Sequence, residues 1–225
     1  MPADFFNIII AVLSLVYVFG VVFIMDKFVK KGFPQDISRK IIHIAAGSWL
    51  FFWLFYDNST WTKYLNILPG LVWFVLLIIK GFWADENDEA VKTMTRTGNK
   101  KELLKGPLYF TIIMSFLGTF FYRQEIAVIS MGILGWGDGL APIIGKKFGT
   151  IKYKVFVEKS LQGSISFFIF GFLGAVLLLS VLHMKIDLSL ILLCCVITTI
   201  IEAISPKDLD NLLIPIVCIL IYFLT

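Results

Sequence analysis

The sequence predicts an all-α fold, a polytopic membrane bundle of seven or eight transmembrane helices that forms one domain over residues 1–225. Hydrophobic residues make up 58% of the chain and charged residues only 16%, well below the roughly 25% of a soluble domain. The mean hydropathy is +0.87. Apolar runs follow one another along the chain, and one transmembrane helix needs only about 20 such residues.

The apolar runs place eight spans in order. They cover residues 5–25, from within 39–47 to about 56, 65–83, 108–122, 126–144, 165–182, 188–204 and a short stretch ending at 225. Pro107 is expected in the first turn of the fourth span, where its missing N–H is tolerated. Gly171 and Ala175 in the sixth span have the spacing of a close helix contact.

Several common classes of protein are not indicated. Cys194 and Cys195 are adjacent in one span and Cys218 lies in another, which is neither a disulfide framework nor a zinc-binding spacing. We expect all three to be packing residues. The net charge of +4 is too small to indicate a nucleic-acid partner. Residues 1–4 show no basic segment and no cleavage site, so the first span is expected to stay as an anchor.

Lys and Arg are unevenly divided between the two ends of the spans. The loops after the first, third, fifth and seventh spans hold 17 of the 20, whereas the opposite side holds Lys63, Arg123 and Lys185. By the positive-inside rule the four basic loops face the cytoplasm and both termini face away from it.

A glycine-rich stretch, residues 135–141, interrupts the fifth span. It places the carboxylate of Asp138 in an apolar run, which costs roughly 2.5–3.5 kcal/mol at bilayer depth. Each glycine costs about 1 kcal/mol in a helix relative to Ala, so we expect a broken or unwound helix near Asp138. Freed backbone N–H groups suit phosphate oxygens, and the loop 146–159 that follows is basic. The stretch predicts a phosphate-bearing ligand with a metal ion.

Further polar residues lie at the predicted cytoplasmic ends of the spans. Arg39 and His43 share one helix face, although a snorkelling Arg and an interior His would explain them too. The loop 84–105 is either solvated or holds a metal through acids near a basic stretch, and these acids are Asp85, Glu86, Asp88 and Glu89. The complete set is Arg39/His43, Lys101/Glu102, Asp138, Lys159/Ser160, Glu202 and Asp210/Asn211. A solvated face does not explain three acids at apolar boundaries, so we expect an active site facing the cytoplasm.

Five motifs are spread over positions 39 to 215. They are Arg39-Lys40-x-x-His43, Lys101-Glu102-Leu103-Leu104-Lys105-Gly106-Pro107-Leu108-Tyr109, Gly137-Asp138-x-x-Ala141-x-x-x-Gly145-x-x-x-Gly149, Lys159-Ser160-x-x-Gly163-Ser164, and Glu202 with Asp210-Asn211-x-x-x-Pro215. In this order they resemble the family of CTP-dependent lipid-alcohol kinases, which includes phytol kinase, dolichol kinase and the fungal CTP-dependent diacylglycerol kinase. The second motif is most similar to the phytol and isoprenoid-alcohol branch.

The resemblance implies a kinase that moves the γ-phosphate of a nucleoside triphosphate, CTP favoured, to the hydroxyl of a membrane lipid alcohol. The acceptor would be of the polyprenol, dolichol, phytol or geranylgeraniol type, with diacylglycerol as a further acceptor, and Mg²⁺ would be the cofactor. The implied partners are the alcohol, the nucleotide and the bilayer, without nucleic acid. An oligomer is compatible with the sequence.

The resemblance also implies roles for individual residues. Asp138 and Asp210 would bind Mg²⁺ or take the alcohol proton, and Asn211 would assist the metal. Lys159 would contact phosphate, and Glu202 would hold the metal or pair with Lys159. The guanidinium fork of Arg39 suits phosphate, whereas His43 would orient a substrate or be structural. The other implied nucleotide contacts are Lys40, Lys101, Gly137, Gly139, Lys146, Ser160, Gly163 and Ser164. Gly145 and Gly149 are expected mainly at close-packing or turn positions.

Two alternatives remain open. Phosphatidate cytidylyltransferases have a similar membrane domain, but their C-terminal Lys-Arg and Lys-Asp signature ending in His-Gly-Gly is not found in the C-terminal third here. A transporter would also contain broken helices and ionisable groups. It would more often show an inverted repeat and charges near mid-span, and the sequence shows neither.

Overall fold

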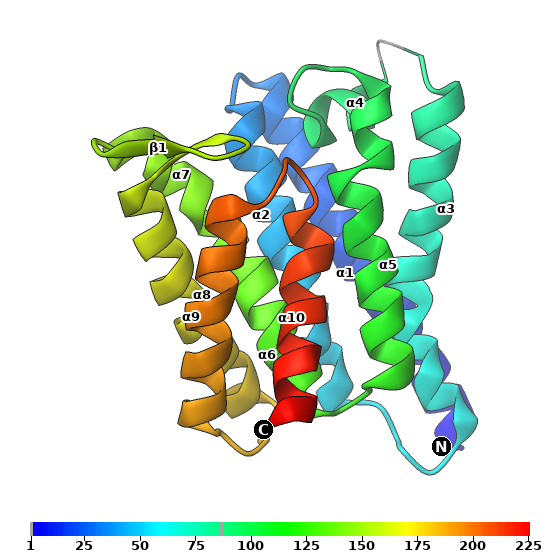
Figure 1. Cartoon of the computed structure of the whole chain (residues 1–225). Helices are drawn as coiled ribbons and strands as arrows, with labels where there is room; N and C mark the ends of the chain where they lie inside the picture. The colour runs from blue at the N-terminus through cyan, green and yellow to red at the C-terminus, as the bar shows by residue number, and fades with distance from the viewer. Residues whose placement is uncertain (1, 86–87) are drawn as a thin grey trace. The chain divides into compact units, whose positions relative to one another are not determined.

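The structure, a computed structural model, is helical over 78% of the chain and has almost no strands (Figure 1). It describes residues 2–85 and 88–225, apart from the side chain of residue 90, so Glu86 lies outside the described residues. The chain divides into two compact units, Met1–Tyr122 (unit 1) and Arg123–Thr225 (unit 2). The all-α class is confirmed, while the single domain over residues 1–225 stays a prediction.

Within the described ranges, five helical segments are long and apolar enough to cross a membrane. They are Ala3–Lys30, Trp61–Trp83, Lys100–Phe120, Glu125–Phe148 and Leu161–Val181. Two shorter apolar helices, Leu188–Ile204 and Asp210–Leu224, follow. The predicted second span is not among them, because charged residues lower the hydropathy of its first turns. A polytopic helical bundle is therefore confirmed.

Unit 1 consists of α-helices and short 3₁₀ helices. Its elements are α1 (Ala3–Lys30), α2 (Gln35–Gly47), η1 (Ser48–Leu54), η2 (Trp61–Ile67), α3 (Leu68–Trp83), α4 (Glu89–Met94), η3 (Lys100–Leu104) and α5 (Gly106–Phe120). Pro107 lies in the first turn of α5, as predicted. The loop 84–105 contains α4 and η3, and it buries Val91 and Leu103 completely in a cluster with Val22, Ile42 and other apolar side chains. This loop is therefore part of the unit's core.

Asn66 connects several buried polar groups of unit 1 through hydrogen bonds, which buried polar groups generally require. Asn66 accepts hydrogen bonds from the indole Nε1 of Trp49 through its carbonyl oxygen (2.9 Å) and from that of Trp53 through Oδ1 (3.1 Å). Its Nδ2 donates to the carbonyl of Gly118 at 3.1 Å. Asn66 thereby joins η1, η2 and α5.

Unit 2 holds the rest of the chain. Its elements are α6 (Glu125–Gly132), the π-helical turn η4 (Ile133–Gly137), α7 (Asp138–Phe148), β1 (Lys152–Lys154), β2 (Glu158–Ser160), α8 (Leu161–Val181), α9 (Leu188–Ile204) and α10 (Asp210–Leu224). Strands β1 and β2 pair as an antiparallel hairpin, which the sequence did not predict. Cys194, Cys195 and Cys218 are buried and free, which confirms that they are packing residues.

The predicted interruption near Asp138 is a change of helical type, and the chain does not unwind. The five residues of η4 form a π-helical turn between α6 and α7, and the N–H of Asp138 donates to the carbonyl of Ile133. Glycines let this segment lie close to α8. A Cβ at Gly132 would lie 2.5 Å from the Cα of Ala175, and a Cβ at Gly137 would lie 2.9 Å from the carbonyl oxygen of Phe167. The small-residue contact predicted on α8 is therefore present.

Candidate functional site

Asp138 is the first residue of α7 and follows the π turn directly. Its side chain is buried, with a relative exposure of 5%. The π turn before it continues from α6 without a break, and π turns occur frequently at functional sites. The structure thus places this acid inside unit 2, directly after the π turn of a membrane-length helix.

Lys159 and Glu202 form a buried ion pair between β2 and the last turn of α9. The Nζ of Lys159 donates to Oε1 of Glu202 at 2.5 Å and also to the Glu202 backbone carbonyl. The two side chains are only 16% and 8% exposed. Of the two roles predicted for Glu202, the structure shows the pairing with Lys159. An ammonium group has three donors, and these two bonds use two of them.

Asp210 and Asn211 open α10 side by side. Oδ1 of Asp210 accepts from the Asn211 backbone N–H at 3.0 Å and from its Nδ2 at 3.3 Å. Nδ2 also donates to the carbonyl of Asp208 at 3.2 Å. Asn211 is 7% exposed, and its Oδ1 is buried with no hydrogen-bond partner in the part of the chain that the structure describes. A buried amide oxygen without a donor is a natural ligand for a cation or a hydroxyl group.

Two prolines release backbone carbonyls near these residues. Pro142 lies inside α7 and Pro215 inside α10, four residues after Asp138 and Asn211 respectively. Proline has no N–H for the carbonyl four residues earlier. The usual helical donor is therefore missing for the carbonyls of both Asp138 and Asn211. The sequence motifs contained Pro215 but not Pro142, and this four-residue spacing is the signal that would have identified it.

The start of α8 is held by the residues that the sequence assigned to phosphate. Oγ of Ser160 caps the helix by accepting from the Gly163 N–H at 3.2 Å. A Cβ on Gly145 or Gly149 would come within 2.9 or 2.5 Å of that Oγ, so both glycines are close-packing residues, as predicted. Ser164 bonds through its hydroxyl to Tyr153 of β1. These contacts give Ser160, Gly163 and Ser164 structural roles, and a phosphate contact by them stays a prediction.

The other nucleotide-binding residues predicted in unit 2 lie along η4 and α7. Gly137 and Gly139 are buried on either side of Asp138, and Lys146 is exposed in the last turn of α7. Gly137 faces the backbone of α8, which explains the absence of a side chain there without a ligand.

The four predicted residues of unit 1 lie on α2 and η3. Arg39 and His43 are half-buried and Lys40 is buried. The His43 ring packs against Phe110 of α5, with 4.5 Å between ring centroids. Lys101 is exposed, and its Nζ lies 4.7 Å from the centroid of the Phe82 ring. Their substrate contacts stay predictions.

Some of the predicted site residues offer oxygen atoms that could bind a divalent cation. Within the described residues, no three His, Cys, Asp or Glu side chains are grouped as a metal site. Mg²⁺ does not need such a group, because it binds through one or two carboxylates together with substrate phosphates and water. The buried Asp138 and the unpartnered Oδ1 of Asn211 fit that pattern.

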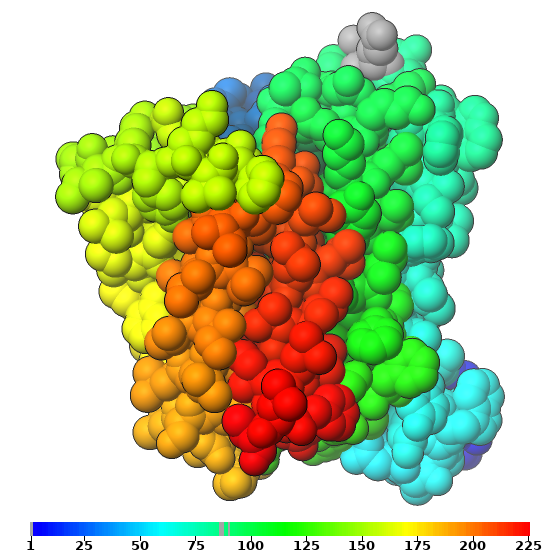
Figure 2. Space-filling model, viewed as in Figure 1, coloured from blue at the N-terminus to red at the C-terminus, as the bar shows by residue number. Residues whose placement is uncertain are grey.

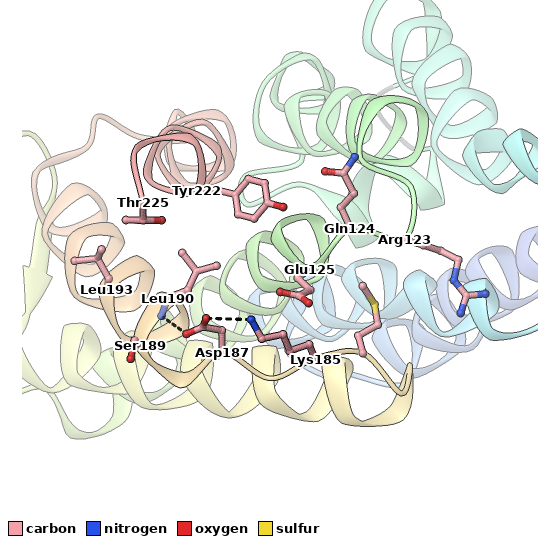
Figure 3. A pocket seen from close by; sticks show the side chains of 11 residues that line it. Arg123, Gln124, Glu125, Lys185, Asp187, Ser189, Leu190, Leu193, Tyr222 and Thr225 are labelled. Atoms are coloured by element: carbon pink, nitrogen blue, oxygen red, sulfur yellow. Dashed lines mark hydrogen bonds and ion pairs between the residues drawn. The ribbon is translucent and has the colours of Figure 1, made fainter.

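A cavity of about 740 Å³ lies at the far end of unit 2 (Figure 3). It is bordered by the beginnings of α6 and α9 and the end of α10, with Glu125, Asp187 and Tyr222 in its wall. Lys185 and Asp187 pair across its floor at 3.7 Å. The 21 residues of α8 separate this end from Lys159, a length of about 30 Å. None of the predicted site residues lines the cavity.

Comparison with known proteins gives related sequences over most of the chain. "Phytol kinase 1, chloroplastic" from Arabidopsis thaliana is 35% identical over 203 residues, which are 85% of this chain and 67% of that protein. The chain belongs to the isoprenoid-alcohol kinase family. "Probable phytol kinase, chloroplastic" from Triticum aestivum is 33% identical over 84% of this chain and 67% of that protein. "Farnesol kinase, chloroplastic" from Arabidopsis thaliana is 34% identical over 65% of this chain and 49% of that protein.

No family model and no solved structure matches the chain. The family is therefore identified by similarity to related sequences alone. The membership agrees with the branch that the motif 101–109 indicated.

Proposed function

We propose that this chain is a lipid-alcohol kinase that transfers the terminal phosphoryl group of a nucleoside triphosphate, with CTP as the donor, to the hydroxyl of an isoprenoid alcohol in the membrane. The carrying observation is the 35% identity to a phytol kinase over 85% of the chain. The product would be the lipid monophosphate. The assay described below tests both the alcohol and the nucleotide.

The chemistry asks little covalent work of the protein. Phosphoryl transfer needs the phosphates held in line, the developing charge neutralised and the attacking hydroxyl oriented. Lys159 supports the first two tasks, because its third N–H remains for a phosphate oxygen after two are bonded to Glu202. The pair with Glu202 fixes the position of the ammonium group and preserves its charge.

The acids at the helix starts suit the metal and the proton. Asp138 or Asp210 would hold Mg²⁺ with the Asn211 oxygen, and the other acid would accept the proton of the alcohol. Bound Mg²⁺ would neutralise the charge on the phosphate oxygens. The buried, unpartnered Oδ1 of Asn211 supports this assignment, because nothing in the described chain otherwise stabilises it. Arg39, Lys40, His43 and Lys101 are proposed as further substrate contacts on unit 1.

The test is a product assay with purified protein. Each labelled nucleoside triphosphate is offered with a panel of phytol, farnesol, geranylgeraniol, polyprenol, dolichol and diacylglycerol. A lipid monophosphate, formed fastest from CTP, is the expected product. A CDP-linked lipid would indicate a cytidylyltransferase, and no product with any pair would leave a transporter as the better explanation.

We further propose that the substrates meet at the cytoplasmic face, with both termini on the other side. The support is the concentration of 17 of the 20 Lys and Arg residues in four loops. Single cysteines at Lys92 and Lys152, both exposed, should react with an impermeant reagent only from the cytoplasmic side. Labelling of these positions only from the outer side would contradict the orientation.

A further inference from the structure

The hairpin of β1 and β2 occupies the short connection between two membrane-length helices. The chain leaves the first of these at Phe148 and enters the second at Leu161. With only 12 residues between them, the hairpin must stay close to the level at which both helices meet the membrane surface. Figure 1 shows it extending sideways from the ends of α7 and α8, and not upward away from them.

The hairpin and its flanks expose large apolar side chains. The exposed fractions are 57% for Phe148, 58% for Ile151, 55% for Val155 and 64% for Phe156. Val155 and Phe156 form the tip, immediately after β1. In the space-filling view the hairpin projects outward as a ledge beyond α8 and α9 (Figure 2). In water such a group of apolar side chains is unfavourable, so its exposure indicates a binding surface.

The charges around this apolar tip are predominantly positive. Residues 146–158 contain four lysines, at positions 146, 147, 152 and 154, and a single acid, Glu158. Glu158 is bonded to Lys152 at 2.8 Å, and this bond lowers the pKa of its carboxyl group. Lys154 is exposed directly before the tip, and Lys147 is exposed in the last turn of α7. The surface therefore combines aromatic and aliphatic side chains with a net positive charge.

We propose that this hairpin is an interfacial anchor, in which Val155 and Phe156 enter the boundary between head groups and acyl chains while Lys147 and Lys154 contact the phosphates of anionic lipids. Apolar side chains flanked by lysines bind membrane surfaces in this way. A lipid surface is favoured over a protein partner because the adjoining helices fix the hairpin at the height of the leaflet.

The anchor bears directly on Lys159. In the hairpin Tyr153 lies opposite Lys159, and the Tyr153 hydroxyl bonds to Ser164 near the start of α8. A hairpin held by the leaflet would hold β2, and with it the ammonium group paired with Glu202. This coupling rests on the proposed kinase function, whereas the membrane contact itself does not.

The contact is tested without any assay of activity. Phe156→Cys is labelled with the polarity-sensitive fluorophore NBD, and the protein is reconstituted in vesicles of phosphatidylcholine alone or mixed with phosphatidylglycerol. Lys207→Cys, an exposed loop position in the same unit, is the matched control, and the labelled parent protein with its three buried cysteines gives the background. We expect blue-shifted emission at position 156 that lipids with nitroxide-labelled acyl chains quench, and water-like emission at 207.

Further variants separate the contributions. Lys147→Gln with Lys154→Gln should remove the additional shift produced by phosphatidylglycerol. The coupling to Lys159 predicts that anionic lipid stimulates phosphate transfer by the parent protein. Phe156→Ser should reduce this stimulation, whereas Phe223→Ser, which removes a ring that is 70% exposed on α10, should not. Water-like emission at position 156 in both kinds of vesicle overturns the proposal. Shielded emission that nitroxide lipids do not quench overturns it as well, because the tip would then contact protein. If the parent protein shows no kinase activity while the probe at position 156 is still quenched, the proposed function alone is refuted.

Discussion

The Lys159–Glu202 pair allows the structural and the chemical role of Lys159 to be separated. Lys159→Met removes an ammonium group that is 16% exposed and leaves the carboxylate of Glu202, 8% exposed, without this partner. Breaking a buried pair from one side typically costs about 3–5 kcal/mol. Glu202→Gln should cost less, about 1.5–3 kcal/mol, because the Glu202 backbone carbonyl still accepts from Nζ.

The double variant Lys159→Met with Glu202→Gln separates the two roles. When both charges are removed, no buried charge is left unpaired, so most of the lost stability should return. The coupling in this double-mutant cycle should therefore be several times the roughly 0.5 kcal/mol expected of independent sites. Stability is measured by thermal unfolding of purified protein in detergent, and activity by transfer of labelled phosphate to the alcohol.

The expected outcome is a stable but inactive double variant. If Lys159 binds phosphate, restoring the fold does not restore the charge-assisted hydrogen bond to the nucleotide. An active double variant would refute the role given to Lys159, because the ammonium group would then serve only to neutralise Glu202. If the double variant instead loses as much stability as the two single variants together, the buried pair is refuted.

Three further perturbations follow from the geometry. Asp138→Asn keeps the size of the side chain but removes its charge, so phosphate transfer should fall by at least about a hundredfold while expression and purification are unchanged. Near-normal turnover at saturating Mg²⁺ would show that Asp138 has a structural role. Gly132→Val should lower the melting temperature strongly, since its Cβ would lie 2.5 Å from the α8 backbone, whereas Gly20→Val, with nothing within 4 Å, should not. Asp187 caps α9, and the backbone N–H of Leu190 lowers its pKa below the ordinary 3.8. The charge-dependent part of its capping is therefore complete above that pH and disappears as the pH falls through the lower folded value. Because the amide oxygen of Asn also caps helices, Asp187→Asn should lower the melting temperature only slightly near neutral pH and have no effect in strong acid.

The spans were predictable where composition changes abruptly. Helix α9 agrees residue for residue with the predicted 188–204, because its apolar run ends at Ser205-Pro206. The hairpin was missed because its strands, Lys152–Lys154 and Glu158–Ser160, are rich in charged residues, whereas the β-branched and aromatic residues at 155–157 form the bend between them. The site was predicted in its residues more than in its contacts. Lys159 and Glu202 are 43 positions apart, and no local pattern indicated which of two roles Glu202 takes.

The form of the helix at Asp138 was also beyond the sequence. Glycines at 135, 137 and 139 indicated an interruption through their low helix propensity. Whether the chain unwinds or widens depends on the backbone hydrogen bonds, and here close packing on α8 accompanies a helix that stays wound. The sequence likewise assigned Ser160 to phosphate, whereas in the structure it caps α8. An N-cap serine and a phosphate-binding serine both lie at the start of a helix, so the sequence does not distinguish them.

The π turn also gives the site helix a particular tolerance to changes in chain length. A π turn accommodates about one extra residue within an α-helix, so α6 and α7 can keep their facing directions although the chain between them is longer than an ordinary helix requires. Deleting one residue from Ile133–Gly137 would convert the π turn into regular α-helix without rotating α6 relative to α7. Elsewhere in the same helix a deletion would turn everything beyond it by about 100°. Length variants within these five positions therefore offer a way to remove the local widening before Asp138 while the membrane helix around it is preserved.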